Sequence, residues 1–228
     1  MVAIVGHRGA AGLEPENTIL SFYRALDYDA DELELDVRMS KDGEIVIVHD
    51  DTVDRTTNGH GRVSEICLAD LRRMDAGKGE GMPTLYEFLW STRSQAAFFN
   101  IEIKEQGCED KVVNLVRQFA DEKRTHIISF NASILRKVRK MGLKVGLGFD
   151  GRMAQRFEVA CRLKATRIWP HKRLVTQWLV KQAHGAGMEI VAWTVNEPDE
   201  MRHLADLGVD GICTDYPDRA VKILRQQP

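Results

Sequence analysis

The chain has 228 residues, with 32 Lys and Arg against 34 Asp and Glu, and a formal net charge of −2. This balance lacks the basic excess of most nucleic-acid-binding proteins, so we expect no nucleic-acid partner.

No apolar run approaches the roughly 20 residues of a membrane span, and the run after Met1 is too short for a signal peptide, which favours a cytoplasmic protein without membrane insertion. The spacing of the cysteines excludes zinc-ribbon and redox motifs and indicates reduced thiols at Cys67, Cys108, Cys161 and Cys213.

Segments typical of strands and helices alternate along the chain. Amphipathic periodicity predicts the helices; Ile19, Phe22 and Leu26, for example, share one face. Eight β-α units in this length predict an α/β fold, a (β/α)₈ TIM barrel with its chemistry at the C-terminal ends of the strands. An open doubly wound sheet is the alternative, but it would not need polar residues at so many strand ends. The predicted strands are 2–6, 32–37, 97–104, 126–130, 144–149, 166–170, 189–195 and 211–215.

One region interrupts this alternation. The turn signal "KDG" follows the second strand, and residues 44–50 then resemble a further strand with no helix between. We expect a hairpin with a two-residue turn, at 41–42 or 42–43, which would set His49 opposite Glu34 or Asp36. An ordinary parallel strand is the alternative. Residues 51–83 are expected to form a small insertion over the barrel mouth, within a single domain that spans 1–228.

Acidic side chains gather near the ends of two predicted strands. Side chains alternate between the faces of a strand, so Glu34 and Asp36 share one face, as do Glu102 and Lys104. Inside a barrel three carboxylates would repel one another unless a cation lay among them. An all-oxygen ligand set favours Mg²⁺ or Ca²⁺ as the cofactor. The alternative is a buried network in which Arg8 and Lys104 pair with these acids, but the joint placement of the acids at strand ends favours the metal.

Two histidines also end strands in this region. His7 follows the first strand and His49 follows the extra strand, and imidazole titrates near neutral pH, so the pair can serve as general acid and base. Arg8 offers a planar fork and Lys104 a point charge for a phosphate. A metal, two cations and two histidines together indicate phosphodiester hydrolysis. Trp193 ends a later strand and is equally consistent with a core residue or an apolar wall for the substrate.

Eight motifs, in order along nearly the whole chain, resemble those of the glycerophosphodiester phosphodiesterases, within the broader phospholipase C-like phosphodiesterases. The motifs are "HRG" (7–9), "PENT" (15–18), "ELDV" (34–37), "HDDTVDRTTNG" (49–59), "PTLYEFL" (83–89), "NIEIK" (100–104), "WTVN" (193–196) and "GVDGICTDYPD" (208–218).

The resemblance implies a barrel with an insertion, a metal at Glu34, Asp36 and Glu102, an acid–base pair of His7 and His49, and Arg8 on the phosphate. It implies hydrolysis of small glycerophosphodiesters to sn-glycerol 3-phosphate and an alcohol. Which histidine is the acid, and whether a cyclic phosphate forms, stay open. A lysophospholipase D-type enzyme, another phospholipase C-like phosphodiesterase and a non-catalytic phosphate-ester binding protein are the alternatives. A binding protein would be expected to lack one of the histidines or carboxylates, and none is missing.

Overall fold

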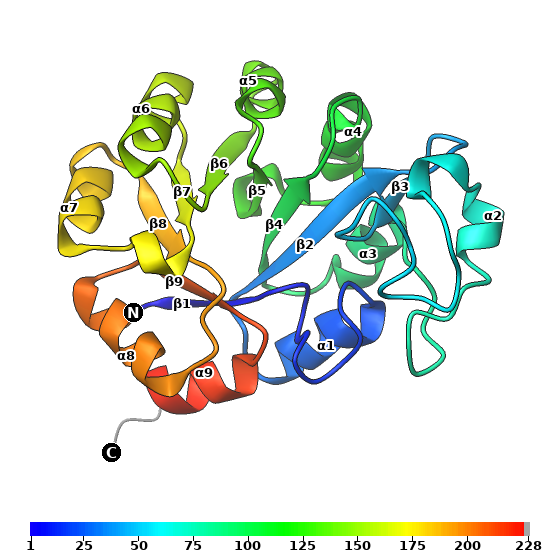
Figure 1. The fold of residues 1–228 in the computed structure, drawn as a ribbon, viewed down its shortest axis with the longest axis horizontal. Coiled ribbons are helices and arrows are strands. Elements are labelled where there is room, and N and C mark those ends of the chain that lie inside the picture. The colour runs from blue at the N-terminus through cyan, green and yellow to red at the C-terminus, as the bar shows by residue number, and fades with distance from the viewer. Residues whose placement is uncertain (226–228) are drawn as a thin grey trace.

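The structure, a computed structural model, describes residues 1–225. Eight parallel strands and one antiparallel strand form its sheet (Figure 1). The strands are β1 (Ala3–Gly6), β2 (Glu32–Met39), β3 (Ile45–Ile47), β4 (Phe98–Ile103), β5 (Thr125–Ser129), β6 (Lys144–Phe149), β7 (Arg167–Pro170), β8 (Glu189–Ala192) and β9 (Gly211–Thr214).

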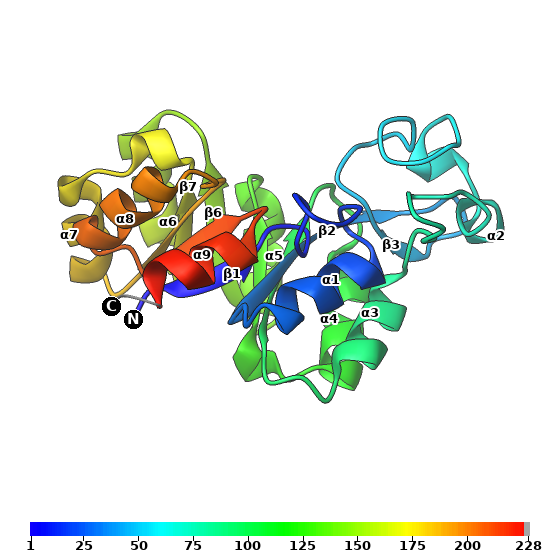
Figure 2. The same ribbon diagram turned by 90° about the horizontal axis from the view of Figure 1, so that it is seen from below.

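The parallel strands close into a barrel. β1 pairs with β9 on one side and with β2 on the other, and the order between them is β9-β8-β7-β6-β5-β4-β2. The predicted TIM barrel is therefore confirmed, and the open doubly wound sheet is wrong. Figure 1 shows the helices on the outside of the strands, and Figure 2 shows the same arrangement from below.

Helices follow most of the strands. They are α1 (Ile19–Asp27), α2 (Leu68–Leu71), α3 (Leu85–Thr92), α4 (Glu109–Phe119), α5 (Ala132–Lys140), α6 (Met153–Leu163), α7 (Gln177–Gly185), α8 (Pro198–Leu207) and α9 (Pro217–Leu224). Their ends follow local chemistry. The side chain of Thr84 and that of Glu87 cap each other's backbone at the start of α3. Gly208 ends α8 with a φ of 88°, a conformation that glycine adopts without steric cost.

The apolar residues form three clusters. The largest lies between the strands and the helices and includes Phe22, Phe88 and Ile101. A second cluster fills the barrel interior and contains Val5, Ile128, Trp169, Val191 and Cys213, with Trp193 packed against it. Because the interior is filled, a ligand can bind only above it, at the C-terminal ends of the strands.

The β2–β3 pair is an antiparallel hairpin, as predicted, but its register differs from both predicted registers. Val37 pairs with Ile47 and Met39 with Ile45, and the backbone N–H of Ser40 donates to the carbonyl of Glu44, so the turn between the paired positions contains three residues, 41–43. Gly43 supplies the extra residue with a φ of +82°, and Ser40 accepts a hydrogen bond from the backbone of Glu44. The two-residue turn was the wrong prediction, because it ignored this left-handed glycine.

The short β1 makes room for the hairpin. β1 pairs only with the start of β2, at Glu32 and Leu33, whereas β3 pairs with the far end of β2. After Ile47 the chain leaves the sheet and runs through residues 48–82, which have a small apolar cluster of their own that includes Val53, Val63 and Leu71. In Figure 1 this segment, which contains α2, lies to one side of the barrel, beside β3. The assignment of the chain to a single domain stays a prediction.

The four cysteines are not joined by disulfides, and two of them, Cys108 and Cys213, are buried. None of the helices within residues 1–225 combines the length and the apolar character needed to cross a bilayer.

Candidate functional site

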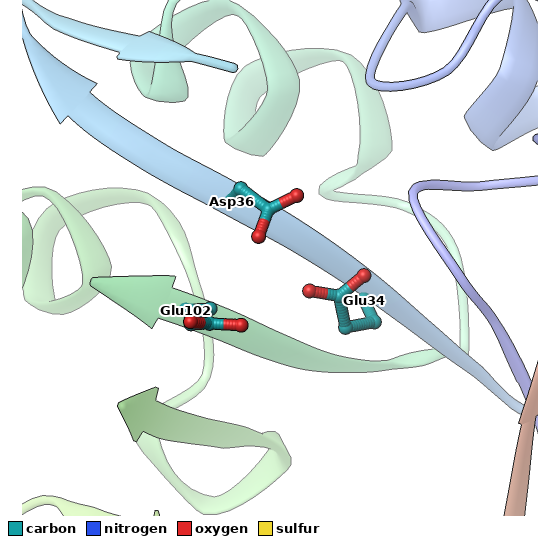
Figure 3. Close-up of side chains that lie close together, drawn as sticks. All are labelled: Glu34, Asp36 and Glu102. Carbon is teal, nitrogen blue, oxygen red and sulfur yellow. The ribbon is translucent and has the colours of Figure 1, made fainter. Parts of the chain in front are cut away.

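Three carboxylates converge at the barrel mouth. Glu34 and Asp36 lie on β2 and Glu102 on β4, where Asp36 and Glu102 are directly paired in the sheet. Figure 3 shows the three side chains on the same side of these two strands. One oxygen from each carboxylate lies within 4.8 Å of the others, the spacing of a potential metal site. The predicted alternation of faces along β2 and β4 therefore brings these residues together.

Burial makes this cluster costly in the absence of a cation. Glu34 and Asp36 are 4% and 1% exposed. Burial, together with the charge of Asp36, raises the pKa of Glu34 to about 8. Burial also raises the pKa of Glu102, although Lys104 opposes the shift. For Asp36 the effect of burial is outweighed by Lys104 and Arg8, and its pKa is lowered.

Two basic side chains offset only part of this negative charge. Nζ of Lys104 lies 2.8 Å from Glu102 and 3.3 Å from Asp36, and Nε of Arg8 lies 3.2 Å from Asp36. Glu34 is not part of an ion pair among the described residues, and it accepts a hydrogen bond from the backbone N–H of Arg8 at 2.9 Å. Three carboxylates and two cations leave one acid unmatched, so the all-oxygen donor set fits a hard divalent cation.

The turn after β1 places His7 and Arg8 beside this cluster. Gly9 has a φ of +85°, and a Cβ atom there would come within 2.5 Å of the backbone of Ser21. Ser21 holds the turn, because its side chain accepts from the N–H of Ala10 and donates to the carbonyl of Arg8. Glycine is therefore needed where the chain bends from the strand into the site.

Each candidate catalytic histidine is held by an aspartate. Nδ1 of His7 lies 2.6 Å from Asp215, and Nδ1 of His49 lies 2.6 Å from Asp50. A carboxylate bound to Nδ1 favours the tautomer in which Nε2 carries the lone pair. Burial lowers the pKa of both rings. For His7 the hydrogen bond to Asp215 and the negative charges of Glu34 and Asp215 together outweigh burial, so its pKa is raised, whereas the pKa of His49 is lowered. The two rings therefore differ in basicity.

Both histidines line one cavity of about 80 Å³ above the filled barrel interior. Arg8, Glu34, Glu102 and Lys104 form its charged side, and the apolar side consists of Ile128, Phe130, Trp169, Trp193 and Cys213. Trp193 donates its indole N–H to the carbonyl of Trp169 and packs edge-on against Phe130. The cavity thus combines a charged half with an aromatic wall.

A profile of the glycerophosphoryl diester phosphodiesterase family matches residues 7–219. The chain belongs to this family. A glycerophosphodiester phosphodiesterase from Caldanaerobacter subterraneus subsp. tengcongensis is 37% identical over 237 residues, which cover 98% of each chain. One from Bacillus altitudinis is 34% identical, with the same coverage of both chains. The chain is therefore an enzyme of the phosphodiesterase class, and the prediction from the ordered motifs is confirmed.

Solved structures of this family share the fold. A protein from Silicibacter pomeroyi described as a putative glycerophosphoryl diester phosphodiesterase is 28% identical, with a TM-score of 0.92 over 98% of this chain and 93% of that one. A phosphodiesterase from Oleispira antarctica, solved with its product sn-glycerol-3-phosphate, is 27% identical, with a TM-score of 0.91 over 97% and 96% of the two chains.

The structure brings the eight predicted site residues of the chain together in one region. Seven line the cavity, and Asp36 lies just below it, in contact with Arg8 and Lys104. His49 reaches this cavity although the hairpin register differs from the predicted one, because the chain bends after β3. Two residues of "PENT" support the structure around the site. Thr18 caps α1, and Asn17 donates a hydrogen bond to Asp36 at 3.0 Å.

The sequence reasoning missed the residues that hold the site in place. Asp215 and Asn196 lie in the motifs "TDYPD" and "WTVN", but neither had been given a role. Glu16 of "PENT" pairs with Arg8 at 2.8 Å and forms a bidentate ion pair with Arg55 of the insertion. Phe130 follows β5 and lines the cavity, and nothing in its sequence context distinguished it from a core residue.

Proposed function

We propose that this enzyme hydrolyses glycerophosphodiesters to sn-glycerol 3-phosphate and an alcohol, with a divalent metal ion and with His7 and His49 as acid and base. The observation that carries the proposal is the placement of two aspartate-held imidazoles around one cavity that also contains a three-carboxylate cluster. The product complex of the Oleispira antarctica phosphodiesterase supports the choice of substrate.

Glu34, Asp36 and Glu102 would hold the metal ion. A bound Mg²⁺ or Ca²⁺ would supply Lewis acidity to an oxygen of the substrate. Arg8 and Lys104 lie beside the carboxylates and line the same cavity, so they can bind the non-bridging oxygens of the phosphodiester and offset the charge that develops on them. Arg8 would also help to orient the phosphorus for attack.

The two imidazoles would move the protons. Nε2 of one ring accepts a proton from the attacking oxygen, and Nε2 of the other gives a proton to the oxygen of the leaving alcohol. Asp215 and Asp50 fix the tautomers and stabilise the imidazolium in each case. The aromatic wall of Phe130, Trp169 and Trp193 would cover the carbon skeleton of the substrate and exclude water from that side.

An assay of the purified protein tests the proposal. The substrates are glycerophosphocholine, glycerophosphoethanolamine, glycerophosphoglycerol and a lysophospholipid, and release of glycerol 3-phosphate is measured after chelation and after addition of Mg²⁺, Ca²⁺ or Mn²⁺. We expect metal-dependent release from the small diesters. Full activity in the presence of the chelator would contradict the requirement for a metal ion. Cleavage of the lysophospholipid alone would contradict the proposed class of substrate.

A further inference from the structure

A second cavity continues from the catalytic one. It is a groove of about 630 Å³, and it shares His49, Glu102, Lys104 and Phe130 with the first cavity. From these shared residues it extends past the end of β5 to the first turn of α5 and to Arg156 on α6. The first cavity, at about 80 Å³, accommodates only compact groups, so the variable part of a substrate has room only in the groove.

Phe130 connects the two cavities. Its ring centroid lies 5.9 Å from Nζ of Lys104, and its backbone carbonyl accepts a hydrogen bond from Nη2 of Arg156. Lys104 therefore contacts the ring of Phe130, and Arg156 contacts its backbone.

The side chain of Arg156 is positioned by hydrogen bonds to the backbone and has no acidic partner among the described residues. Its Nη2 donates to the carbonyls of Phe130 and Gly148, at 2.5 and 2.8 Å. Among residues 1–225 its guanidinium forms no ion pair, and Asp150 acts on it only as a more distant charge. Nε and Nη1 are left without a protein partner in this part of the chain. The guanidinium is thus fixed in position through Nη2, while the N–H groups of Nε and Nη1 stay available for single hydrogen bonds to a ligand.

The charges along the groove favour an anion. Besides Arg156, the groove is lined by Lys104 and His49, and its one acid is Glu102, which already pairs with Lys104. The remaining lining is uncharged and includes Ser129 at the end of β5, Asn131 at the N-cap of α5 and Ala132 at its first position. A cationic head group such as choline would meet Arg156 with like charge and would find no acid to pair with it.

We propose that the groove binds the leaving alcohol and that Arg156 selects alcohols that carry a negatively charged group, a phosphate or a carboxylate. The inference rests on the proposed glycerophosphodiesterase function and adds the class of head group to it. A phosphate or carboxylate oxygen can accept a charge-assisted hydrogen bond from Nε or from Nη1 of Arg156, the two nitrogens that do not donate to the backbone carbonyls.

Three substrates with matched three-carbon head groups, together with glycerophosphocholine, test the proposal. We would measure kcat and KM for glycerophosphoglycerol, for the same diester with a terminal phosphate, for glycerophosphoglycerate and for glycerophosphocholine. The wild type should favour the two anionic head groups over glycerophosphoglycerol by about tenfold in kcat/KM. This is the lower end of the effect expected for one charge-assisted hydrogen bond at a partly exposed site. The difference should lie in KM, and glycerophosphocholine should be the poorest substrate. A preference for the phosphate alone would assign the site to phosphate, and a preference for both would assign it to anionic oxygens in general.

The variant Arg156→Gln removes the charge while its amide can still donate to the two carbonyls, so the end of β5 should stay in place. In this variant the ratio of anionic to neutral substrate should fall to about one, and Arg156→Lys should retain part of it. Arg162→Ala is the matched control, because Arg162 lies on the same helix, is exposed and pairs only with Glu158; it should keep the wild-type ratio.

A wild-type enzyme without preference among these diesters, or an unchanged ratio in Arg156→Gln, would overturn the head-group site and leave the proposed function intact. Failure to cleave any of the four diesters would overturn the proposed function and the head-group site together.

Discussion

Nδ1 of His7 lies 2.6 Å from Oδ1 of Asp215, across the seam where the first and last strands of the barrel meet. Asp215 is itself fixed, because Asn196 donates to its other oxygen at 2.6 Å and accepts from its backbone N–H. The closure of the barrel therefore sets the orientation of His7. If His7 is a catalytic acid or base, as proposed, we expect Asp215 to act through it as a positioning residue.

Replacing Asp215 by Asn should lower kcat while the fold and KM change little. The amide keeps the size of the carboxylate but does not fix the Nδ1–H tautomer, and the loss is bounded by the 10²–10⁴-fold contribution of one acid–base group. Steady-state kinetics and the thermal midpoint measure both effects. Asp206→Asn, an exposed change on α8, is the control. A kcat equal to that of the wild type would show that Asp215 has no such role.

Replacing His7 or His49 by Ala should each lower turnover by roughly 10²–10⁴-fold. Both residues lie beyond strand ends, so circular dichroism and the thermal midpoint should stay close to the wild type. The double variant should lose less than the product of the single losses, because the two rings act in one proton-transfer scheme. His203→Ala, an exposed change on α8, is the control. Strictly multiplicative losses would mean that the two histidines act independently.

Arg55 connects the insertion to both sides of the site. It binds Glu16 with two hydrogen bonds of 2.8 Å, and it binds Asp50, the partner of His49, at 2.6 Å. We expect Arg55→Ala to reduce kcat by about tenfold, as the loss of an outer positioning contact does. Arg62→Ala is the matched control, since Arg62 is also an exposed insertion residue paired with an aspartate, Asp51. Equal kinetics of these two variants would argue against a positioning role.

Metal binding should be visible without catalysis. At 100 times its dissociation constant a ligand stabilises the folded state by about 2.7 kcal/mol, which corresponds here to a rise in Tm of roughly 5–10 °C. Glu34→Gln should abolish this rise, yet it should be at least as stable as the metal-free wild type, because it removes an acid that is crowded by Asp36. Differential scanning calorimetry with and without Mg²⁺ or Ca²⁺ measures both values, with Glu158→Gln as an exposed control. Destabilisation of the metal-free Glu34→Gln protein would contradict this account.

The sequence predicted the parts of the site that depend on local patterns. Apolar runs located the strands, and the period of two along β2 and β4 placed Glu34, Asp36 and Glu102 on one face. The contact of His7 with Asp215 joins residues 208 positions apart and exists only in the closed barrel, so no local pattern could reveal it. The hairpin register depended on the backbone of one glycine, Gly43, whose left-handed φ was not considered.

A last prediction concerns stability and lies outside the catalytic site. His126 on β5 is 4% exposed, and its Nδ1 atom is buried without a hydrogen-bond partner. Burial, together with the charges of Arg167 and Lys144, lowers its pKa from 6.5 to about 3. The unfolded chain therefore binds a proton between these two values that the folded chain does not. The free energy of unfolding should decrease as the pH falls through this window, by up to about 1.4 kcal/mol per pH unit.

Replacing His126 by Leu should remove this contribution. Urea unfolding at pH 7.5, 6.0, 5.0 and 4.5 would give the free energy of unfolding of the wild type and of the variant. Because the carboxylates titrate in both proteins, the difference between the two curves isolates His126. The variant should lose less stability on acidification than the wild type, whereas His203→Leu, with the histidine exposed on α8, should follow the wild-type curve. Parallel curves for wild type and His126→Leu would show that His126 is protonated as readily in the folded protein as in the unfolded chain.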